Sequence, residues 1–130
     1  MLKEITLKTG KRNELVDITP EIEAAVAESR VKEGICVVYC PHTTAGITVN
    51  ENADPDVKED LLAALEKMIP KIGFKHAEGN SDSHIKSSLV GNEKTFIIEK
   101  GKLVLGAWQG ILFAEFDGPR SRRAIVKVRG

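Results

Sequence analysis

Three short stretches of the sequence concentrate side chains that could do chemistry. CPHTTAGITVNENADPD, residues 40–56, holds a histidine followed by two threonines, an Asn-Glu pair and two aspartates, with a third threonine at residue 48. EGNSDSHIK, residues 78–86, holds a second histidine, and the third histidine precedes it. EFDGPRSRR, residues 115–123, combines two carboxylates with three arginines. The first question is whether these stretches meet in one site or form separate loops.

The three histidines, His42, His76 and His84, all fall in polar junctions or at a helix start, and none falls in an apolar stripe. His84 is expected in the first turn of a helix, whose positive end favours neutral imidazole. Neutral imidazole is the form that binds metals. Three such ligands plus a water would complete a tetrahedral site of the kind found in catalytic zinc centres. We therefore expect the three to converge on one pocket that accepts a first-row divalent metal. The alternative for each is a hydrogen-bonded structural histidine.

Carboxylates and amides near the histidines are the candidates for acid–base chemistry. Asp54 precedes Pro55, so helix capping explains it, but capping does not explain Glu51. We expect Glu51 to lie close enough to the histidines to orient a bound water, with Asn50 and Asp117 as further catalytic candidates. The alternative for Asn50 and Glu51 is the end of a strand that leads into a helix.

Arg120 and Arg122 are candidate anion ligands, because the planar guanidinium fork matches phosphate and carboxylate. The alternative for this stretch is a salt-bridged hairpin, and we prefer it for Arg123, whose parity matches the solvated strand face of Lys127 and Arg129.

The remaining substrate-binding candidates are Thr43, Thr44 and Gln109. If residues 107–117 are extended, Gln109 shares a face with Glu115 and Asp117. Both threonines could instead be turn formers.

Composition limits the class of protein. The chain has 130 residues, 42% of them hydrophobic and 29% charged, which is typical of a single globular domain spanning residues 1–130. The formal net charge of zero gives no electrostatic reason for binding nucleic acid or a membrane surface. No apolar run reaches the ~20 residues of a membrane span. The N-terminal residues read as a strand rather than a signal peptide, so a cytoplasmic protein is expected.

Periodicity predicts strands at both ends of the chain with helices between them. Thr19 and Pro20 indicate the start of a first helix, which ends at Gly34. Asp54 and Pro55 indicate the start of a second helix. Its predicted buried stripe consists of Val57, Leu61, Ala64, Leu65 and Met68. A short third helix is expected over residues 81–91. Strands are predicted within residues 4–9, 14–19, 34–40, 46–50, 94–101, 102–106, 107–117 and 122–129. This order indicates an α+β fold: one compact domain, mainly antiparallel sheet or sandwich, with two longer helices and one short helix.

Cys36 and Cys40 lie in the strand-like stretch ICVVYC. Four residues of strand span roughly 13 Å, whereas a disulfide requires Cα atoms closer than about 7 Å. The two thiols are therefore expected to stay reduced, apart and buried.

Three ordered motifs, HTTAGITVNE, GNSDSHIKSSLVG and KGKLVLGAWQGILFAEFDGPRSRR, resemble the YjbQ-type family, whose members are named secondary thiamine-phosphate synthases. The resemblance covers essentially the whole chain. It implies a compact α+β domain that assembles as a homotrimer and carries a histidine cluster able to hold a metal. The matching positions are His42, Thr43, Thr44, Asn50, Glu51, Asp54, Asn80, His84 with His76 ahead of it, Trp108, Gln109, Glu115, Asp117, Gly118, Arg120 and Arg122.

The family name implies the coupling of hydroxymethylpyrimidine diphosphate to thiazole phosphate, and hence a phosphorylated small-molecule substrate. Trp108 or Phe116 could stack the pyrimidine, although a lone tryptophan is more often a core residue. Magnesium, the usual partner of diphosphate, prefers oxygen ligands, whereas histidines favour zinc or another first-row metal. Two other functions therefore stay open: a metal-dependent hydrolase of a phosphorylated small molecule, and a non-catalytic trimeric module that binds a small ligand.

Overall fold

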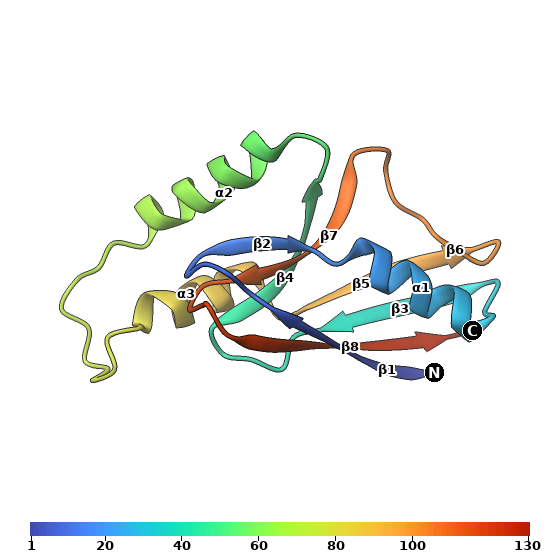
Figure 1. The fold of residues 1–130 in the computed structure, drawn as a ribbon, viewed down its shortest axis with the longest axis horizontal. Helices are drawn as coiled ribbons and strands as arrows, with labels where there is room; N and C mark the ends of the chain where they lie inside the picture. Colours follow the sequence, from blue (N-terminus) through green and yellow to red (C-terminus); the bar gives the residue numbers. More distant parts are fainter.

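The two ends of the chain pair with each other in the larger of two antiparallel sheets. The computed structural model describes residues 1–130 (Figure 1). β1 (Leu2–Lys8) runs antiparallel to β8 (Ser121–Arg129), which in turn pairs with β3 (Gly34–Tyr39). β5 (Glu93–Glu99) and the short β6 (Lys102–Leu103) complete the five-stranded order β1-β8-β3-β5-β6. The predicted strand over residues 102–106 is thus only two residues long.

The smaller sheet places its most apolar strand at the centre. β7 (Gln109–Glu115) lies between β2 (Glu14–Asp17) and β4 (Ala45–Glu51). Every β7 residue from Gly110 to Glu115 is buried, because neighbouring strands satisfy its backbone and both of its faces are covered.

Between the two sheets lies one hydrophobic core, to which Cys36 and Val38 of β3 contribute beside Ile47 of β4 and Phe113 of β7. The α+β fold predicted from the sequence is confirmed. The prediction for the cysteines is confirmed as well, since both are buried and free. Burial raises the pKa of the Cys36 thiol to about 11, so it is not a reactive thiolate.

Two connections cross between the sheets at the same end of the molecule. Residues 40–44 lead from β3 in the large sheet to β4 in the small one, and residues 116–120 lead from β7 back to β8. Gly118 permits this close packing, because a Cβ there would lie 2.3 Å from the carbonyl oxygen of Lys11. The HTT and DGPR motifs therefore meet although about 75 residues separate them along the chain.

The first helix is shorter than the sequence predicted. α1 (Thr19–Ser29) buries Ile22, Ala25 and Val26, as expected, but it ends at a left-handed Arg30 rather than at Gly34. Gly34 instead begins β3. Thr19 is not the N-cap: its hydroxyl accepts a hydrogen bond from the amide of Ile111.

The third helix packs against the small sheet. α3 (Ser81–Val90) places His84 in its first turn, as predicted, and ends at Gly91. A Cβ on Gly46 of β4 would lie 2.4 Å from the carbonyl oxygen of Gly91, so glycine is required where the helix end meets the strand. The N-cap residue of α3 is Asn80, whose side chain makes no capping bond.

The predicted buried stripe of the second helix is wrong. α2 (Pro55–Met68) begins as expected, with Asp54 accepting a hydrogen bond from the Asp56 amide, but none of its residues is buried and Met68 is 65% exposed. Figure 1 shows most of α2 projecting away from the two sheets, although it approaches β2 of the small sheet. An ion pair of 2.5 Å joins its Glu66 to the fully buried Lys86 of α3. None of the three helices has the length and apolar composition needed to cross a membrane.

Candidate functional site

A buried ion pair joins the two sheets at the end where both connections cross. Glu115, the last residue of β7, receives two hydrogen bonds from the Arg122 guanidinium of β8, one of them at 2.9 Å from Nε. Both side chains are almost completely buried. Thr9 donates to Glu115 at 2.7 Å, and Arg122 donates to the Thr44 hydroxyl, also at 2.7 Å. Each sheet thus contributes two members of this network.

The network sets the protonation state of its carboxyl group. Burial alone would raise the pKa of Glu115, but hydrogen bonds from Arg122, Thr9 and the Asp117 amide outweigh it, so the pKa lies below its ordinary value. Glu115 is therefore a permanent anion that holds Arg122 in one position.

Arg122 keeps one side of its guanidinium free. Its Nε and Nη2 atoms donate hydrogen bonds to Glu115 and Thr44. Its Nη1 has no acceptor within the protein and is not fully buried. Arg122 also lines a polar pocket of about 330 Å³. A guanidinium held on one side and open on the other is a preorganised anion ligand.

His42 is bonded to the backbone of β8. Its Nε2 accepts a hydrogen bond of 3.0 Å from the Arg123 amide, so in the neutral ring the proton sits on Nδ1. Burial, together with the positive charges of Arg122 and Arg123, lowers the pKa of His42. Neutral imidazole is therefore its form at pH 7.

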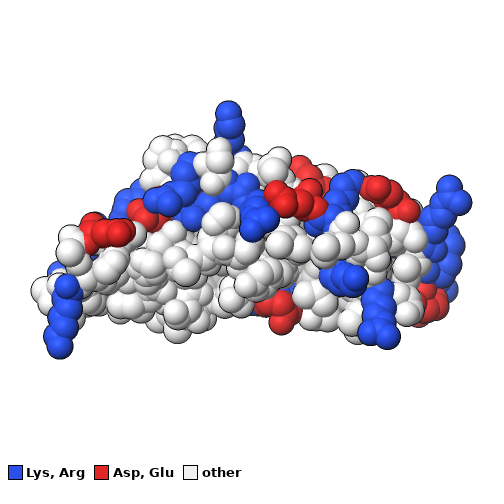
Figure 2. All heavy atoms as spheres, turned by 90° about the horizontal axis from the view of Figure 1, so that it is seen from below, with Lys and Arg blue, Asp and Glu red and all other residues white.

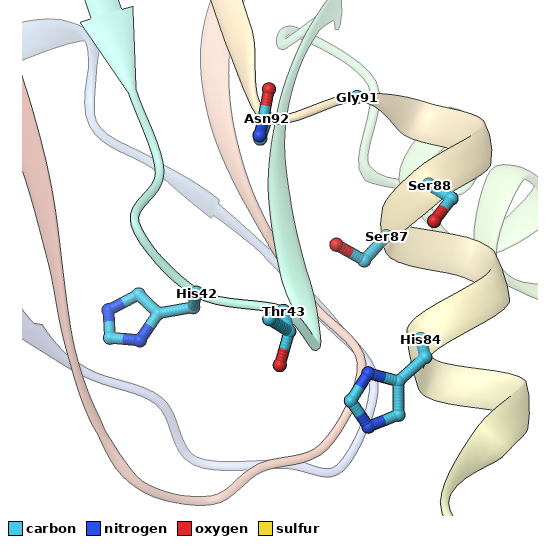
Figure 3. Close-up of a pocket in the computed structure, with 7 residues that line it drawn as sticks. All are labelled: His42, Thr43, His84, Ser87, Ser88, Gly91 and Asn92. Carbon is cyan, nitrogen blue, oxygen red and sulfur yellow. The ribbon is translucent and has the colours of Figure 1, made fainter.

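Two adjoining pockets share His42, Thr43 and His84. The first, of about 480 Å³, is completed by Ser87, Ser88, Gly91 and Asn92 (Figure 3). The second is the 330 Å³ pocket, and its other lining residues are Pro41, Thr44, Glu78, Asn80, Asp117, Arg120 and Arg122. Neither contains a hydrophobic lining residue.

His76 and His84 lie side by side, with ring centroids 5.4 Å apart and planes at 89°. That spacing suits two imidazoles that share one ion at about 2 Å from each nitrogen.

Figure 3 shows the His42 ring directed away from His84. No three His, Cys, Asp or Glu side chains form a ready metal cluster, so His42 and His84 share a pocket without converging as co-ligands.

Asn80 lines the same pocket as His84 and carries an unpartnered side-chain oxygen. Its Nδ2 donates to Asp117 at 2.9 Å, and its Oδ1 is the one buried side-chain polar atom without a hydrogen-bond partner. A buried acceptor without a donor is costly unless a cation or a ligand hydrogen occupies the space beside it.

Comparison with known proteins decides the family. The family model described as "UPF0047 protein YjbQ-like" matches residues 3–130. The chain belongs to the UPF0047 family. A UPF0047 protein of Methanocaldococcus jannaschii is 63% identical over 100% of this chain and 95% of its own length, and YugU of Bacillus subtilis is 52% identical over the full length of both.

Solved structures agree with this placement. A YjbQ/UPF0047-family protein of Clostridium acetobutylicum superposes with a TM-score of 0.95 at 57% identity, over 98% of this chain and 99% of that one. A protein of Sulfolobus solfataricus, described as of unknown function, gives a TM-score of 0.95 at 36% identity, over 98% and 95% of the two chains.

The structure brings most of the predicted site residues of this UPF0047 chain together. The two pockets hold His42, Thr43, Thr44, His84, Asp117, Arg120 and Arg122, and His76 contacts His84. Arg120 lies partly exposed, with Nη2 bonded to Asp117 at 3.1 Å. Arg123 is exposed and pairs with Glu4, as the strand parity predicted.

Glu51 does not lie beside the histidines of the same chain, contrary to the expectation from the sequence. Asn50 and Glu51 end β4, about 20 Å along the strand from Thr44 at ~3.3 Å per residue. Gln109 of β7 pairs with Glu51 of β4, and the Gln109 side chain accepts a hydrogen bond from the Gly106 amide. These three residues therefore belong to the opposite end of the small sheet. Trp108, also at that end, is 66% exposed rather than in the core.

Sequence reasoning missed a second buried charge network. Asp82, which was not among the predicted site residues, is 1% exposed and receives two hydrogen bonds from Arg12, at 3.1 and 3.2 Å. These bonds lower the pKa of Asp82. Lys86 lies 3.7 Å from Asp82, one helical turn along α3. The only signal in the sequence was the i, i+4 spacing of opposite charges, which is more common on exposed helix faces.

We predict that Glu115→Gln lowers the free energy of unfolding by about 3–5 kcal/mol, because it leaves the Arg122 charge buried without its partner. The matched control is Glu4→Gln, which breaks the exposed pair with Arg123 and should cost less than about 1 kcal/mol. Chemical denaturation of both variants measures the difference. Equal, small effects would show that the buried pair does not hold the sheets together.

We predict that His42 is neutral and protonated at Nδ1 at pH 7.5, as ¹⁵N NMR of the imidazole nitrogens can measure. Because its pKa is lowered in the folded state, the unfolded state binds more protons below the ordinary value of about 6.5. Stability should therefore fall as the pH drops from about 6.5 through the lowered pKa, and this part of the loss should disappear in His42→Gln. An Nε2-protonated ring would contradict the bond from Arg123.

Proposed function

We propose that the protein is a metal-assisted enzyme that acts on a small phosphorylated molecule held beside Arg122. The observation that carries this proposal is the guanidinium of Arg122, which is fixed by Glu115 and Thr44, has no protein acceptor at Nη1, and belongs to a residue that lines a pocket without hydrophobic residues. A preorganised positive charge of this kind stabilises phosphate without rearrangement. Arg120 lies at the same pocket and can exchange Asp117 for a phosphate oxygen.

The donors beside Arg122 suit a divalent cation. The imidazoles of His76 and His84 and the unpartnered Oδ1 of Asn80 combine nitrogen and oxygen ligands, which favours zinc or another first-row metal over magnesium. A bound ion would supply Lewis-acid activation of a phosphate oxygen or of water. His42, with its Nε2 lone pair bonded to Arg123, is assigned to the substrate as an Nδ1 donor instead of to the metal.

Asp117 takes the role of base that the sequence assigned to Glu51. It lines the same pocket as His84 and Arg122, and bonds from Asn80 and Arg120 fix its carboxylate. In hydrolysis it would accept a proton from the attacking water while Arg122 stabilises the charge that develops on the phosphoryl oxygens.

Thiamine-phosphate synthesis, which the family resemblance implies, is supported less well than hydrolysis by the residues that line the pocket of a single chain. A pyrimidine or thiazole ring requires apolar or aromatic walls. Phe116 is fully buried and Trp108 lies at the far end of the small sheet, so neither stacks a ring beside Arg122. Hydrolysis of a phosphorylated molecule matches the wholly polar lining better.

We predict that untagged protein contains a first-row metal and releases phosphate from small phosphate esters. Asp117→Asn should lower turnover at least about 100-fold with the metal retained, because it removes the base. His84→Ala should lose both metal and turnover. Metal analysis and a phosphate-release assay measure this, with the exposed Arg123→Ala as control.

Full activity of Asp117→Asn would reject the assignment of the base. Binding of phosphate esters without turnover, unchanged when the metal is stripped, would favour the non-catalytic module.

We also propose that the protein is a homotrimer assembled through the outer face of the large sheet. Ile35 and Ile97 face each other there across β3 and β5, at 44% and 62% exposure, and Tyr39 and Val104 extend the apolar surface. Figure 2, which views the molecule from below, shows charged side chains of both signs separated by uncharged surface. Exposed apolar strands of this kind commonly mark an interface.

Sedimentation should give a mass near three times the 14.2 kDa chain. Ile97→Lys should lower it, because burying a lysine charge at the interface is costly, whereas Glu21→Lys on α1 should not. A wild-type monomer at micromolar concentration would reject the trimer.

A further inference from the structure

The two pockets that share His42, Thr43 and His84 form one cleft whose ends differ in chemistry. The end beside Arg122 carries two arginines and two carboxylates, Glu78 and Asp117. The other end, shown in Figure 3, is lined beyond the shared residues by Ser87, Ser88, Gly91 and Asn92 and has no charged side chain. A ligand that spans the cleft therefore has an anionic part and a neutral, polar part.

Hydrogen-bonding capacity identifies the neutral part. The Ser87 hydroxyl is committed, since it donates to the Ala45 carbonyl oxygen at 2.7 Å. The side chains of Thr43, Ser88 and Asn92 make no hydrogen bond within the chain, and each can both donate and accept. Ligand hydroxyl groups, which also donate and accept, are their matching partners. No charged side chain lines this end, and the nearest ammonium, that of Lys94 beside Gly91, already donates to the carbonyl oxygens of Val90 and Glu93. A hydrocarbon or a planar ring would find no apolar wall.

The space is large enough for such a ligand. The neutral end alone measures about 480 Å³, within the ~300–1,000 Å³ typical of small-molecule sites. Its floor is fixed, because Ser87 is buried and the amide of Ile47 in β4 bonds the carbonyl oxygen of Gly91 at 3.0 Å. Inorganic phosphate would fill only the end beside Arg122.

We propose that the ligand is the phosphate monoester of a polyhydroxylated molecule, of the sugar-phosphate or polyol-phosphate class. Its phosphate lies beside Arg122 and its hydroxyl groups bond Thr43, Ser88 and Asn92. This inference rests on the proposed function, because it needs the phosphate at Arg122, and it adds the identity of the remainder of the ligand.

Calorimetry tests the proposal with a hexose 6-phosphate, inorganic phosphate and phenyl phosphate, on metal-loaded protein that carries Asp117→Asn so that the esters are not hydrolysed during the titration. The hexose phosphate should bind about tenfold or more tightly than either of the others, because two or three additional hydrogen bonds form. Asn92→Leu and Ser88→Val should reduce this preference to about one. Both residues are exposed, so the fold should persist, and Glu21→Gln on α1 is the matched control that keeps the preference.

The outcomes separate the two proposals. If all three compounds bind equally, or if phenyl phosphate binds most tightly, the polyol assignment is overturned while phosphate binding at Arg122 stands. If none binds, or if Arg120→Gln changes no affinity, the phosphate site itself is wrong and both proposals fall. A tenfold preference that survives Asn92→Leu and Ser88→Val would place the hydroxyl groups elsewhere and also overturn the assignment.

Discussion

The ion pair between Glu115 and Arg122 is the interaction on which the arrangement of this end of the molecule depends. Glu115 is the last residue of β7, the central strand of the small sheet. Arg122 is the second residue of β8, the strand that follows in the large sheet. A charge buried without its partner would cost several kcal/mol, so the sheets are held in the one relative position that satisfies both groups. Thr9 and Thr44 use the remaining hydrogen-bonding capacity and extend this constraint to the ends of β1 and β4.

The same constraint explains why the polar motifs are adjacent. Chain segments that pass from one sheet to another cannot continue the strand ladder, so their backbone groups need other partners. Here the Phe116 amide of the β7–β8 connection is satisfied by the Thr44 carbonyl oxygen, and the Arg123 amide of β8, beyond the end of the ladder with β3, is satisfied by the His42 ring. Residues 40–44 and 116–123 thus complete each other's hydrogen bonds, and the pocket between them follows from the topology of the fold.

The sequence predicted the elements that have strong local signals. Asp54 before Pro55 identified the start of α2, and the β-branched stretch around Cys36 identified a buried strand. It also indicated that the histidine and arginine motifs share a site. It could not locate Glu51 relative to them, because that depends on strand length and direction, and β4 carries Glu51 away from His42. The buried stripe assigned to α2 failed for a related reason: periodicity identifies an apolar face but not the surface that covers it.

Buried charges in α3 have a positional role that links the fold to the site. Asp82 is held by Arg12 from the β1–β2 connection, and the Ser83 hydroxyl donates to the Phe116 carbonyl oxygen beside the β7–β8 connection. These bonds fix the first turn of α3 from two sides, and that turn carries His84, four residues after Asn80. A helix start held only by apolar contacts could rotate about its axis, whereas directional bonds on two adjacent residues fix the rotation. The position of the His84 backbone relative to Arg122 is therefore fixed by hydrogen bonds of Asp82 and Ser83, two residues that do not line the pocket.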